Sequence, residues 1–225
     1  MFLKSLILTI LLAASALAQS GGGIAPPNVR VEIESTAGDG CPTGSITPSL
    51  SPDLASLTIL FNSLRTDIPG VMAPAKAKSV CSLRLKFYFA GPYRIAVTGG
   101  DLRAFASIPV NAKSKISVDH FSPLAPDAKT MKKLLMTKEF KGPFEDAIQL
   151  TSNFGTKPLW SWCGTQGGTR GFVLMTVVLT IDSENNNREA DLLTQIDSLD
   201  LNFNPVLKYN MTWVLDNRSC PKSGS

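Results

Sequence analysis

The chain has 225 residues, with 22 Lys and Arg, 18 Asp and Glu, one histidine and a formal net charge of +4. This mild positive charge helps solubility, but it is too small to indicate nucleic-acid binding, and no basic stripe with stacking aromatics accompanies it. The length fits one β domain that can bury a substantial core without a metal.

The first 18 residues are expected to form a secretory signal peptide. Lys4 provides a positive start, residues 6–17 are almost wholly apolar, and Ala16-Leu17-Ala18 matches the small-x-small pattern of a cleavage site. The apolar stretch is shorter than the roughly 20 residues that a membrane-spanning helix needs. We therefore expect a secreted, extracellular protein with no membrane insertion. Residues 19–28, rich in Gly and Pro, are expected to be a flexible N-terminal segment.

Four cysteines follow the expected cleavage site: Cys41, Cys81, Cys163 and Cys220. An even number in an exported chain predicts two disulfides, and four cysteines allow three pairings. Their wide spacing matches neither a zinc motif nor a redox motif. The pairing Cys41–Cys81 with Cys163–Cys220 is preferred, and either loop would restrict the unfolded chain by about 4 kcal/mol.

Residues 29–225 predict a single all-β domain. Alternating apolar and polar residues mark strands at 29–34 and 82–89, as in antiparallel sheets with one buried face. Turn signals at Gly99-Gly100-Asp101 and at the loop 182–188 separate other candidates. Many short strands with frequent turns predict an antiparallel β-sandwich or a jelly-roll-like fold. The further strands are expected at 57–64, 94–98, 102–108, 115–121, 172–181, 193–203 and 206–215.

The lysine-rich segment 129–141 admits two interpretations. Met131, Leu134 and Leu135 have helical spacing, which would fit a short amphipathic helix on an anionic membrane. Lysines are also typical of sheet edges, where they discourage pairing between molecules. We favour an edge strand that continues to a turn at Gly142-Pro143.

Catalytic patterns are sparse. The only histidine, His120, ends a predicted strand and is expected to be an ordinary surface or edge residue rather than a base. The sequence has neither a Gly-x-Ser-x-Gly elbow nor a phosphate-binding loop, and one histidine excludes paired-histidine zinc sites. We therefore expect a non-enzyme without a cofactor or a metal.

The carboxylates leave two alternatives to a non-enzyme without a metal, namely a glycoside hydrolase and a calcium-binding protein. A glycoside hydrolase needs only two of them flanking a sugar. Its candidates are Glu139, Glu145, Asp146, Asp182, Asp197 and Asp200. Asp197 and Asp200 are three apart in a predicted strand, which predicts side chains on opposite faces. Calcium could use an acidic loop that lacks EF-hand spacing and comprises Asp182, Glu184, Asn185, Asn186, Asn187, Glu189 and Asp191.

Trp160 and Trp162 are the binding candidates. In a strand they face the same way, and if exposed they would form a stacking platform for sugar rings or a hot spot for a protein. The preferred alternative packs at least one of them in the core near a disulfide. Asn210 and Asn217 begin two sequons, Asn210-Met211-Thr212 and Asn217-Arg218-Ser219, and are potential glycosylation sites.

Short stretches spread over nearly the whole mature chain carry a family resemblance. They are Gly40-Cys41-Pro42-Thr43-Gly44-Ser45, Ser51-Pro52-Asp53, Leu57 to Leu64, Cys81 to Leu85, Arg103 to Ser107, Gly142-Pro143, Trp160 to Gly164, Ile196 to Asp200, and Trp213 with Cys220. With these stretches in this order and all four cysteines placed, the chain resembles the secreted proteins of domain of unknown function 4360, found mainly in fungi and some bacteria. It departs from them where Ala104-Phe105 replaces Gly-Tyr, Asn62 replaces Asp and Trp162 replaces Pro. The resemblance implies secretion, a β fold and the four-cysteine framework, and it brings no accepted activity.

The leading functional hypothesis is a secreted, non-enzymatic binding protein. It would be a fungal extracellular effector in virulence, acting on a host surface or apoplastic protein such as a cell-wall enzyme or its inhibitor. The first alternative is a cell-wall polysaccharide-binding protein, and the second is a carboxylate-dependent glycoside hydrolase. The oligomeric state and the partner's identity are open at this point.

Overall fold

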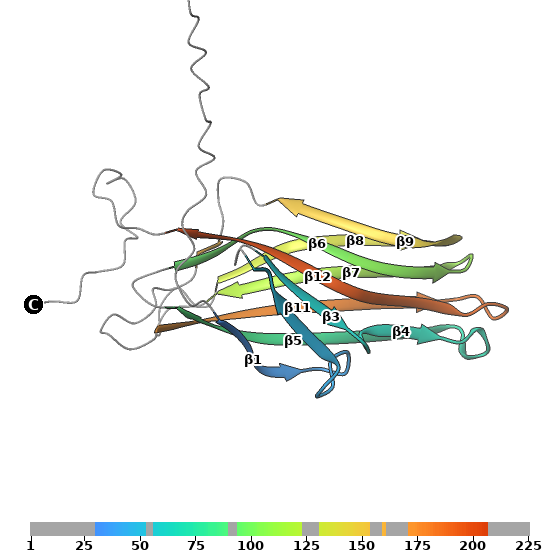
Figure 1. Cartoon of the computed structure of the whole chain (residues 1–225). Helices are drawn as coiled ribbons and strands as arrows, with labels where there is room; N and C mark the ends of the chain where they lie inside the picture. Colours follow the sequence, from blue (N-terminus) through green and yellow to red (C-terminus); the bar gives the residue numbers. More distant parts are fainter. Residues whose placement is uncertain are drawn as a thin grey trace, which may run out of the picture.

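The computed structural model describes residues 30–52, 56–89, 94–122, 131–153, 159–160 and 171–206, which build two antiparallel sheets (Figure 1). The expected all-β antiparallel architecture is confirmed. The only helical element among these residues is the single turn η1 (Gly70–Met72). The expected signal peptide and the flexible segment 19–28 lie outside the described residues.

The five-stranded sheet has the order β1-β5-β11-β7-β8. Its strands are β1 (Arg30–Ala37), β5 (Ala75–Phe89), β11 (Gly171–Asn185), β7 (Ala112–Ser122) and β8 (Met131–Lys141). The segment around 131–141 is therefore an edge strand, as favoured, and the amphipathic-helix interpretation is wrong.

The seven-stranded sheet is built around two long strands, β6 (Arg94–Ile108) and β12 (Leu192–Val206). On the far side of β6 lie β9 (Phe144–Asn153) and β10 (Leu159–Trp160). On the far side of β12 lie β3 (Ser56–Phe61) and β4 (Arg65–Ile68), with β2 (Ile46–Leu50) paired to β3.

Alternation within each strand sends apolar residues to one face, and these faces form one core cluster. Leu83, Leu85 and Phe87 of β5 are 0–1% exposed, and Leu199 and Leu201 of β12 are fully buried. Burying each such side chain stabilises the fold by about 1.5–3 kcal/mol. The apolar residues whose alternation predicted the strands are thus the residues that pack between the two sheets.

A disulfide joins Cys41 to Cys81, with a Cα–Cα distance of 5.1 Å and a sequence separation of 40. Both residues are buried, so the bond ties the chain after β1 to the middle of β5 inside the core. This confirms the first preferred pairing. Cys163 and Cys220 lie outside the described residues, so the second disulfide stays a prediction.

The predicted turn at Gly99-Gly100-Asp101 is wrong, because β6 runs straight through it. A Cβ on Gly100 would stand 2.8 Å from the carbonyl oxygen of Asp200 and 3.1 Å from Cε of Met136. Glycine therefore serves a close approach between β6 and β12 rather than a reversal of the chain. The register of the two strands also shifts between Asn202 and Phe203.

The predicted loop 182–188 is partly wrong, because β11 continues to Asn185. Strands β2, β4 and β9 were not predicted at all. The turn at Gly142-Pro143 is confirmed, and it connects β8 to β9.

Four connections gather at one end of the sandwich, at the right in Figure 1. They join β4 to β5, β6 to β7, β8 to β9 and β11 to β12, and each crosses from one sheet to the other. These connections are named the loop end and comprise residues 69–74, 109–111, 142–143 and 186–191.

Candidate binding surfaces

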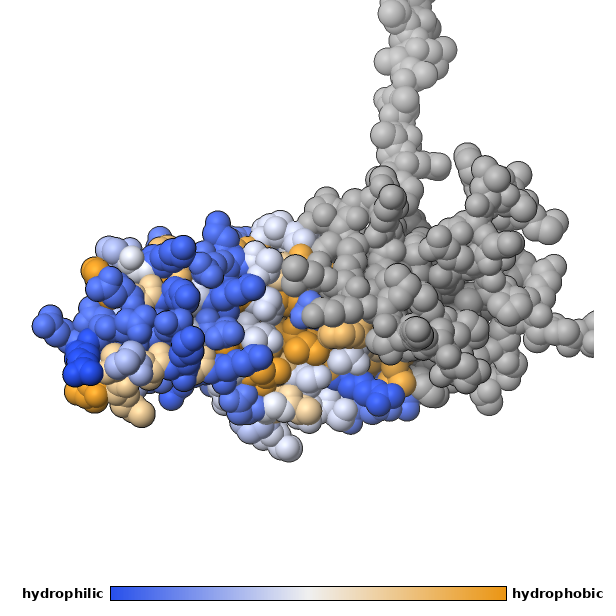
Figure 2. All heavy atoms as spheres, turned by 180° about the vertical axis from the view of Figure 1, so that it is seen from behind, coloured by the Kyte–Doolittle hydropathy of each residue, from blue (hydrophilic) through white to orange (hydrophobic). Residues whose placement is uncertain are grey.

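The loop end carries the most exposed large apolar side chains of the described chain. Val71 and Met72, both in η1, are 90% and 65% exposed, and Val110 in the β6–β7 turn is 50% exposed. Figure 2 shows that the described surface seen from behind is otherwise mostly hydrophilic, with small hydrophobic groups, one of them at the loop end. Val71 and Met72 are named the apolar tip.

The apolar tip stands on a fixed base. The backbone N–H of Gly70 donates to Oδ1 of Asp191 at 2.8 Å, and Ala73 is 6% exposed. A Cβ on Gly70 would lie 2.8–2.9 Å from backbone atoms of Arg188 and Ala190, so the two loops approach as closely as glycine permits. The backbone N–H of Met72 and of Ala73 close the turn with bonds of 3.0 and 2.9 Å. The tip is therefore exposed but held in place.

The four connections of the loop end are also tied to one another. Asn185 is buried, and its amide spans two chain segments, while backbone bonds continue the chain of contacts to the remaining turns. The bonds run from Asn185 Nδ2 to the carbonyls of Ile68 (3.1 Å) and Ala190 (3.0 Å), from Asn186 N to the carbonyl of Asn111 (3.3 Å), and from Gly142 N to the carbonyl of Ala112 (3.0 Å).

A chain of buried hydroxyls joins the two sheets near the loop end. Ser183 of β11 forms hydrogen bonds with Thr66 of β4 at 2.7 Å and with Ser114 of β7 at 2.8 Å. All three residues are at most 3% exposed. Because buried polar groups need partners, these hydrogen bonds fix the relative position of β4, β11 and β7 below the loops.

The outer face of the seven-stranded sheet carries a second candidate surface. Asp101 of β6 lies directly opposite Asp200 of β12. Thr151 of β9 donates to Oδ1 of Asp101 at 2.6 Å, and Thr58 of β3 donates to Oδ1 of Asp200 at 2.5 Å. The four residues form one row across β9, β6, β12 and β3.

Asp197 lies on the same outer face as Asp200, so the prediction of opposite faces is wrong. The register between β12 and β6 shifts between Ile196 and Ser198, which makes Asp197 the extra residue of a β-bulge. Gln195 then donates to Oδ1 of Asp197 at 2.7 Å. The bulge resets the alternation on which the prediction depended.

Next to this row lie Arg103 of β6 and Gln149 of β9, which are paired in register and exposed. Asp101, Asp200, Thr58, Thr151, Arg103 and Gln149 are named the polar face. In the same sheet, β10 places Trp160 opposite Ala96, five residues before Asp101 on β6. That separation corresponds to about 17 Å along the strand. Trp162 lies outside the described residues.

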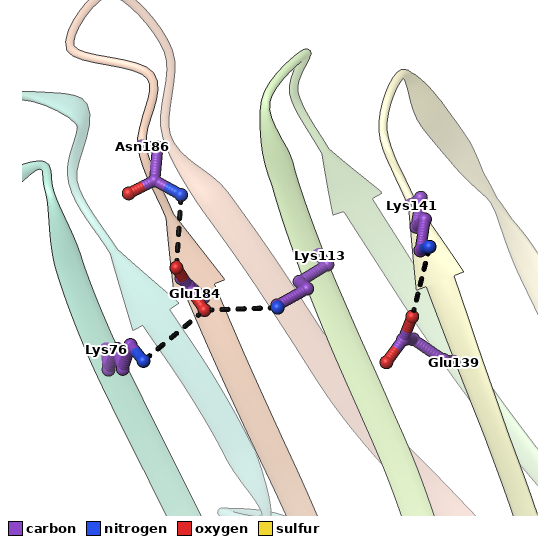
Figure 3. A network of polar contacts seen from close by, with 6 residues as sticks. All are labelled: Lys76, Lys113, Glu139, Lys141, Glu184 and Asn186. Atoms are coloured by element: carbon purple, nitrogen blue, oxygen red, sulfur yellow. Dashed lines mark hydrogen bonds and ion pairs between the residues drawn. The ribbon is translucent and has the colours of Figure 1, made fainter.

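The outer face of the five-stranded sheet is charged next to the loop end, as Figure 3 shows. Nζ of Lys76 and Nζ of Lys113 lie 3.5 and 3.3 Å from Oε2 of Glu184, and Asn186 donates to Oε1 of Glu184 at 3.2 Å. The hydrogen bond from Asn186, followed by the bond and charge of Lys113 and the charge of Lys76, lowers the pKa of Glu184 from its usual 4.5. Glu184 therefore stays ionised in mild acid.

His120 is fully buried in β7, so its prediction as a surface or edge residue is wrong. It shares the inner face with Ile116 and Val118, and β7 is flanked by β11 and β8. The strand continues to Ser122, and the alternation within it sends His120 inward.

The carboxylates proposed for glycoside hydrolysis are spread over both sheets. Glu139 and Asp182 lie on the outer face of the five-stranded sheet, whereas Asp200 belongs to the polar face. The one opposed pair found in the polar face joins Asp200 to Asp101, which sequence reasoning missed. Its signal was hidden because Gly99 and Gly100 were interpreted as a turn.

The proposed calcium loop does not keep its ligands together. Asp182 and Glu184 belong to strand β11, and the amide of Asn185 is buried among backbone carbonyls. Within the described ranges, no group of three or more His, Cys, Asp or Glu side chains is arranged to hold a metal ion. The predicted glycosylation sites Asn210 and Asn217 lie outside those ranges.

Two antiparallel sheets, a buried disulfide and rigid loops at one end define a small all-β protein with several exposed surfaces. Residues 27–214 match the family described as domain of unknown function (DUF4360), and the chain belongs to this family. A relative from Arthroderma benhamiae is 28% identical over 193 residues, covering 84% of this chain and 74% of the relative. Its description is "Uncharacterized secreted protein".

Similarity to solved structures is slight. The structure of TmCBM61 in complex with β-1,4-galactotriose has 11% identity and a TM-score of 0.20, over 82% of this chain and 90% of that one. A structure of infectious bursal disease virus Gx strain has 9% identity and a TM-score of 0.20, over 80% and 43%. Likeness at this level defines neither a fold nor a ligand. In the described part of the chain, no helix has the length and apolar character needed to cross a membrane.

Proposed function

We propose that the chain is a secreted, non-enzymatic binding protein that recognises an extracellular protein through its loop end. The observation that carries the proposal is the apolar tip, where Val71 and Met72 are 90% and 65% exposed on a hydrogen-bonded base. Keeping two apolar side chains in water gives the isolated fold nothing, whereas a rigid apolar anchor loses little entropy when a partner's pocket receives it. Methionine is also enriched in protein interfaces.

The setting of this binding is the extracellular space. The leader pattern at 1–18 and the buried Cys41–Cys81 disulfide support export to an oxidising compartment. The secreted relative from a fungus supports the same setting. We propose that the protein is a fungal effector whose target is a host surface or apoplastic protein, such as a cell-wall enzyme or its inhibitor.

Capture from host extracellular fluid tests this proposal. The V71S/M72S variant should lose at least tenfold in capture, the loss expected when a hot spot is removed. The matched control is L60S. Leu60 is 46% exposed on the outer face of the seven-stranded sheet, away from the loop end, and should be dispensable for capture. Equal capture by the wild type and both variants, all folded by circular dichroism, would exclude the tip as the binding site.

The second candidate function is binding of a cell-wall polysaccharide along the polar face. Each of its carboxylates has about four acceptor positions, so one threonine hydroxyl leaves room for sugar hydroxyl donors, and Arg103 and Gln149 add donors beside them. Trp160 in β10 lies along the same edge of β6. Co-sedimentation with wall polymers should fall in W160A and in D101N/D200N, and unchanged binding in both would refute this candidate.

The hydrolase alternative uses the same pair. Opposed residues in neighbouring strands have Cβ atoms about 4.5–5.5 Å apart, which brings Asp101 and Asp200 near the carboxyl spacing of retaining glycosidases. A screen for released reducing sugars over common wall polymers decides between binding and hydrolysis. The hydrolase alternative is supported if reducing sugars are released and if D101N and D200N each abolish this release. Binding without hydrolysis is supported if the protein retains a polymer and releases no reducing sugar from it.

A further inference from the structure

Eight charged residues form two rows across four strands on the outer face of the five-stranded sheet, beside the loop end. The register places each residue directly opposite the next, in the order β5, β11, β7, β8. The rows are Lys76–Glu184–Lys113–Lys141 and Lys78–Asp182–Lys115–Glu139, and together they are named the lysine face.

Five lysines and three acids make this face basic. Lys76 and Lys113 form ion pairs with Glu184, and Lys141 forms one with Glu139 at 3.5 Å. The side chains of Lys76 and Lys141 are 75% exposed, and that of Lys113 is 50% exposed. Ion pairs this exposed contribute little to stability, so these lysines can turn to an external anion at little cost.

Protection of a sheet edge explains only some of these lysines. Lys141 lies in the edge strand β8, and Lys76 and Lys78 lie in the part of β5 that precedes its pairing with β1 at Ser82–Tyr88. Lys113 and Lys115 lie in β7, which is paired with β11 on one side and with β8 on the other. Lys113 also lies directly opposite Lys141, an arrangement of like charges that destabilises a sheet. Lys113 and Lys115 therefore add positive charge where edge protection does not require it.

The shape of the face favours an extended polymer. Strands in a sheet lie about 4.8 Å apart, so each row spans roughly 14 Å on a surface without large apolar side chains. A compact protein partner would need an apolar anchor, which the eight residues do not provide. We propose that the lysine face binds an acidic polysaccharide whose carboxylates repeat along the chain. This site is separate from the apolar tip and does not depend on the function proposed for it.

Binding of the full secreted chain to polygalacturonate, measured at several salt concentrations, tests the inference. The methyl-esterified polymer, with the same backbone and no charge, is the ligand control and should bind at least tenfold more weakly. The K78Q/K115Q variant should bind about two- to fivefold more weakly for each lysine removed and should show a shallower salt dependence.

The control variant is R30Q/R65Q, which removes two exposed positive charges outside the lysine face, one at the start of β1 and one in β4. It should keep wild-type affinity. Equal losses in the two double variants would overturn the lysine face as the site and indicate attraction by net charge alone. Equal binding of the charged and esterified polymers, or no binding of polygalacturonate at low salt, would overturn the proposed ligand. Capture of a protein partner by K78Q/K115Q should be unchanged, which separates this inference from the proposed function.

Discussion

Asp101 and Asp200 face each other across β6 and β12, and each carboxylate accepts a hydrogen bond from a threonine on the next strand outward. Like charges in directly opposed positions weaken a sheet. Here the hydroxyls of Thr151 and Thr58 offset part of that cost, because hydrogen bonds to charged acceptors are stronger than neutral ones. Among the cross-strand contacts of the polar face, this pair is the least favourable for folding. Its two carboxylates also offer a ligand more hydrogen-bond acceptors than any other pair of that face.

Replacing Asp200 with Asn should stabilise the fold. The change removes one of two like charges and leaves an amide oxygen to accept from Thr58. We expect the free energy of unfolding to rise by about 0.2–1 kcal/mol in urea denaturation at neutral pH and low salt. Near 1 M salt the gain should shrink, because the screening length falls to about 3 Å. A destabilised D200N protein would mean that the bond from Thr58 outweighs the repulsion.

Loss of the Cys41–Cys81 disulfide should be costly. The bond closes a loop with a sequence separation of 40, which corresponds to about 4 kcal/mol of lost unfolded-state entropy. We expect C41A/C81A to be destabilised by about 2–5 kcal/mol in urea denaturation. Peptide mapping without reduction should recover the two cysteines linked to each other. A link from Cys41 to Cys163 or Cys220 would contradict the structure.

The fold should lose more stability when one of the three buried hydroxyls is removed than when all three are replaced. S183A leaves Thr66 and Ser114 buried without their shared partner, which should cost about 1–3 kcal/mol. The triple variant T66V/S114A/S183A replaces all three hydroxyls by apolar groups and should be closer to the wild type. Thermal unfolding of both variants measures the difference. A triple variant less stable than S183A would show that the hydroxyls do more than satisfy one another.

The contribution of Glu184 should depend on pH. Its pKa is lowered in the folded state, first by the hydrogen bond from Asn186 and then by Lys113, so the ionised form is the one that stabilises the fold. The stability difference between the wild type and E184Q should be complete above the unfolded pKa of 4.5 and should vanish as the pH falls through the lower folded pKa. NMR titration of Glu184 checks the direction. A difference that grows on acidification would contradict it.

Sequence patterns predicted the strands where alternation was long and regular, as in β1 and in the second half of β5. They failed where one residue changes the geometry. The β-bulge at Asp197 exchanged the faces of neighbouring side chains, and Gly99-Gly100 allowed two strands to approach where a turn was expected. In both cases the decisive contact comes from another strand, which local sequence does not show.

The candidate surfaces were harder to predict than the fold. The Asp101–Asp200 pair and both rows of the lysine face exist only through register between strands that are about a hundred residues apart in the sequence. The apolar tip was invisible because Val71 and Met72 are ordinary core residue types, and their exposure follows from the contact of Gly70 with Asp191. The Cys41–Cys81 disulfide was the preferred choice among the three pairings that four cysteines allow, whereas the leader pattern at 1–18 lies outside the described residues.

The hydrogen bonds among the connections give the loop end a collective character. The β4–β5 connection contacts the β11–β12 connection, which in turn contacts the β6–β7 turn, and Gly142 continues the contacts to the β8–β9 turn. Exchanging a single loop with that of a relative would therefore remove partners from its neighbours. Transferring binding specificity from one family member to another should succeed only when all four connections are exchanged together.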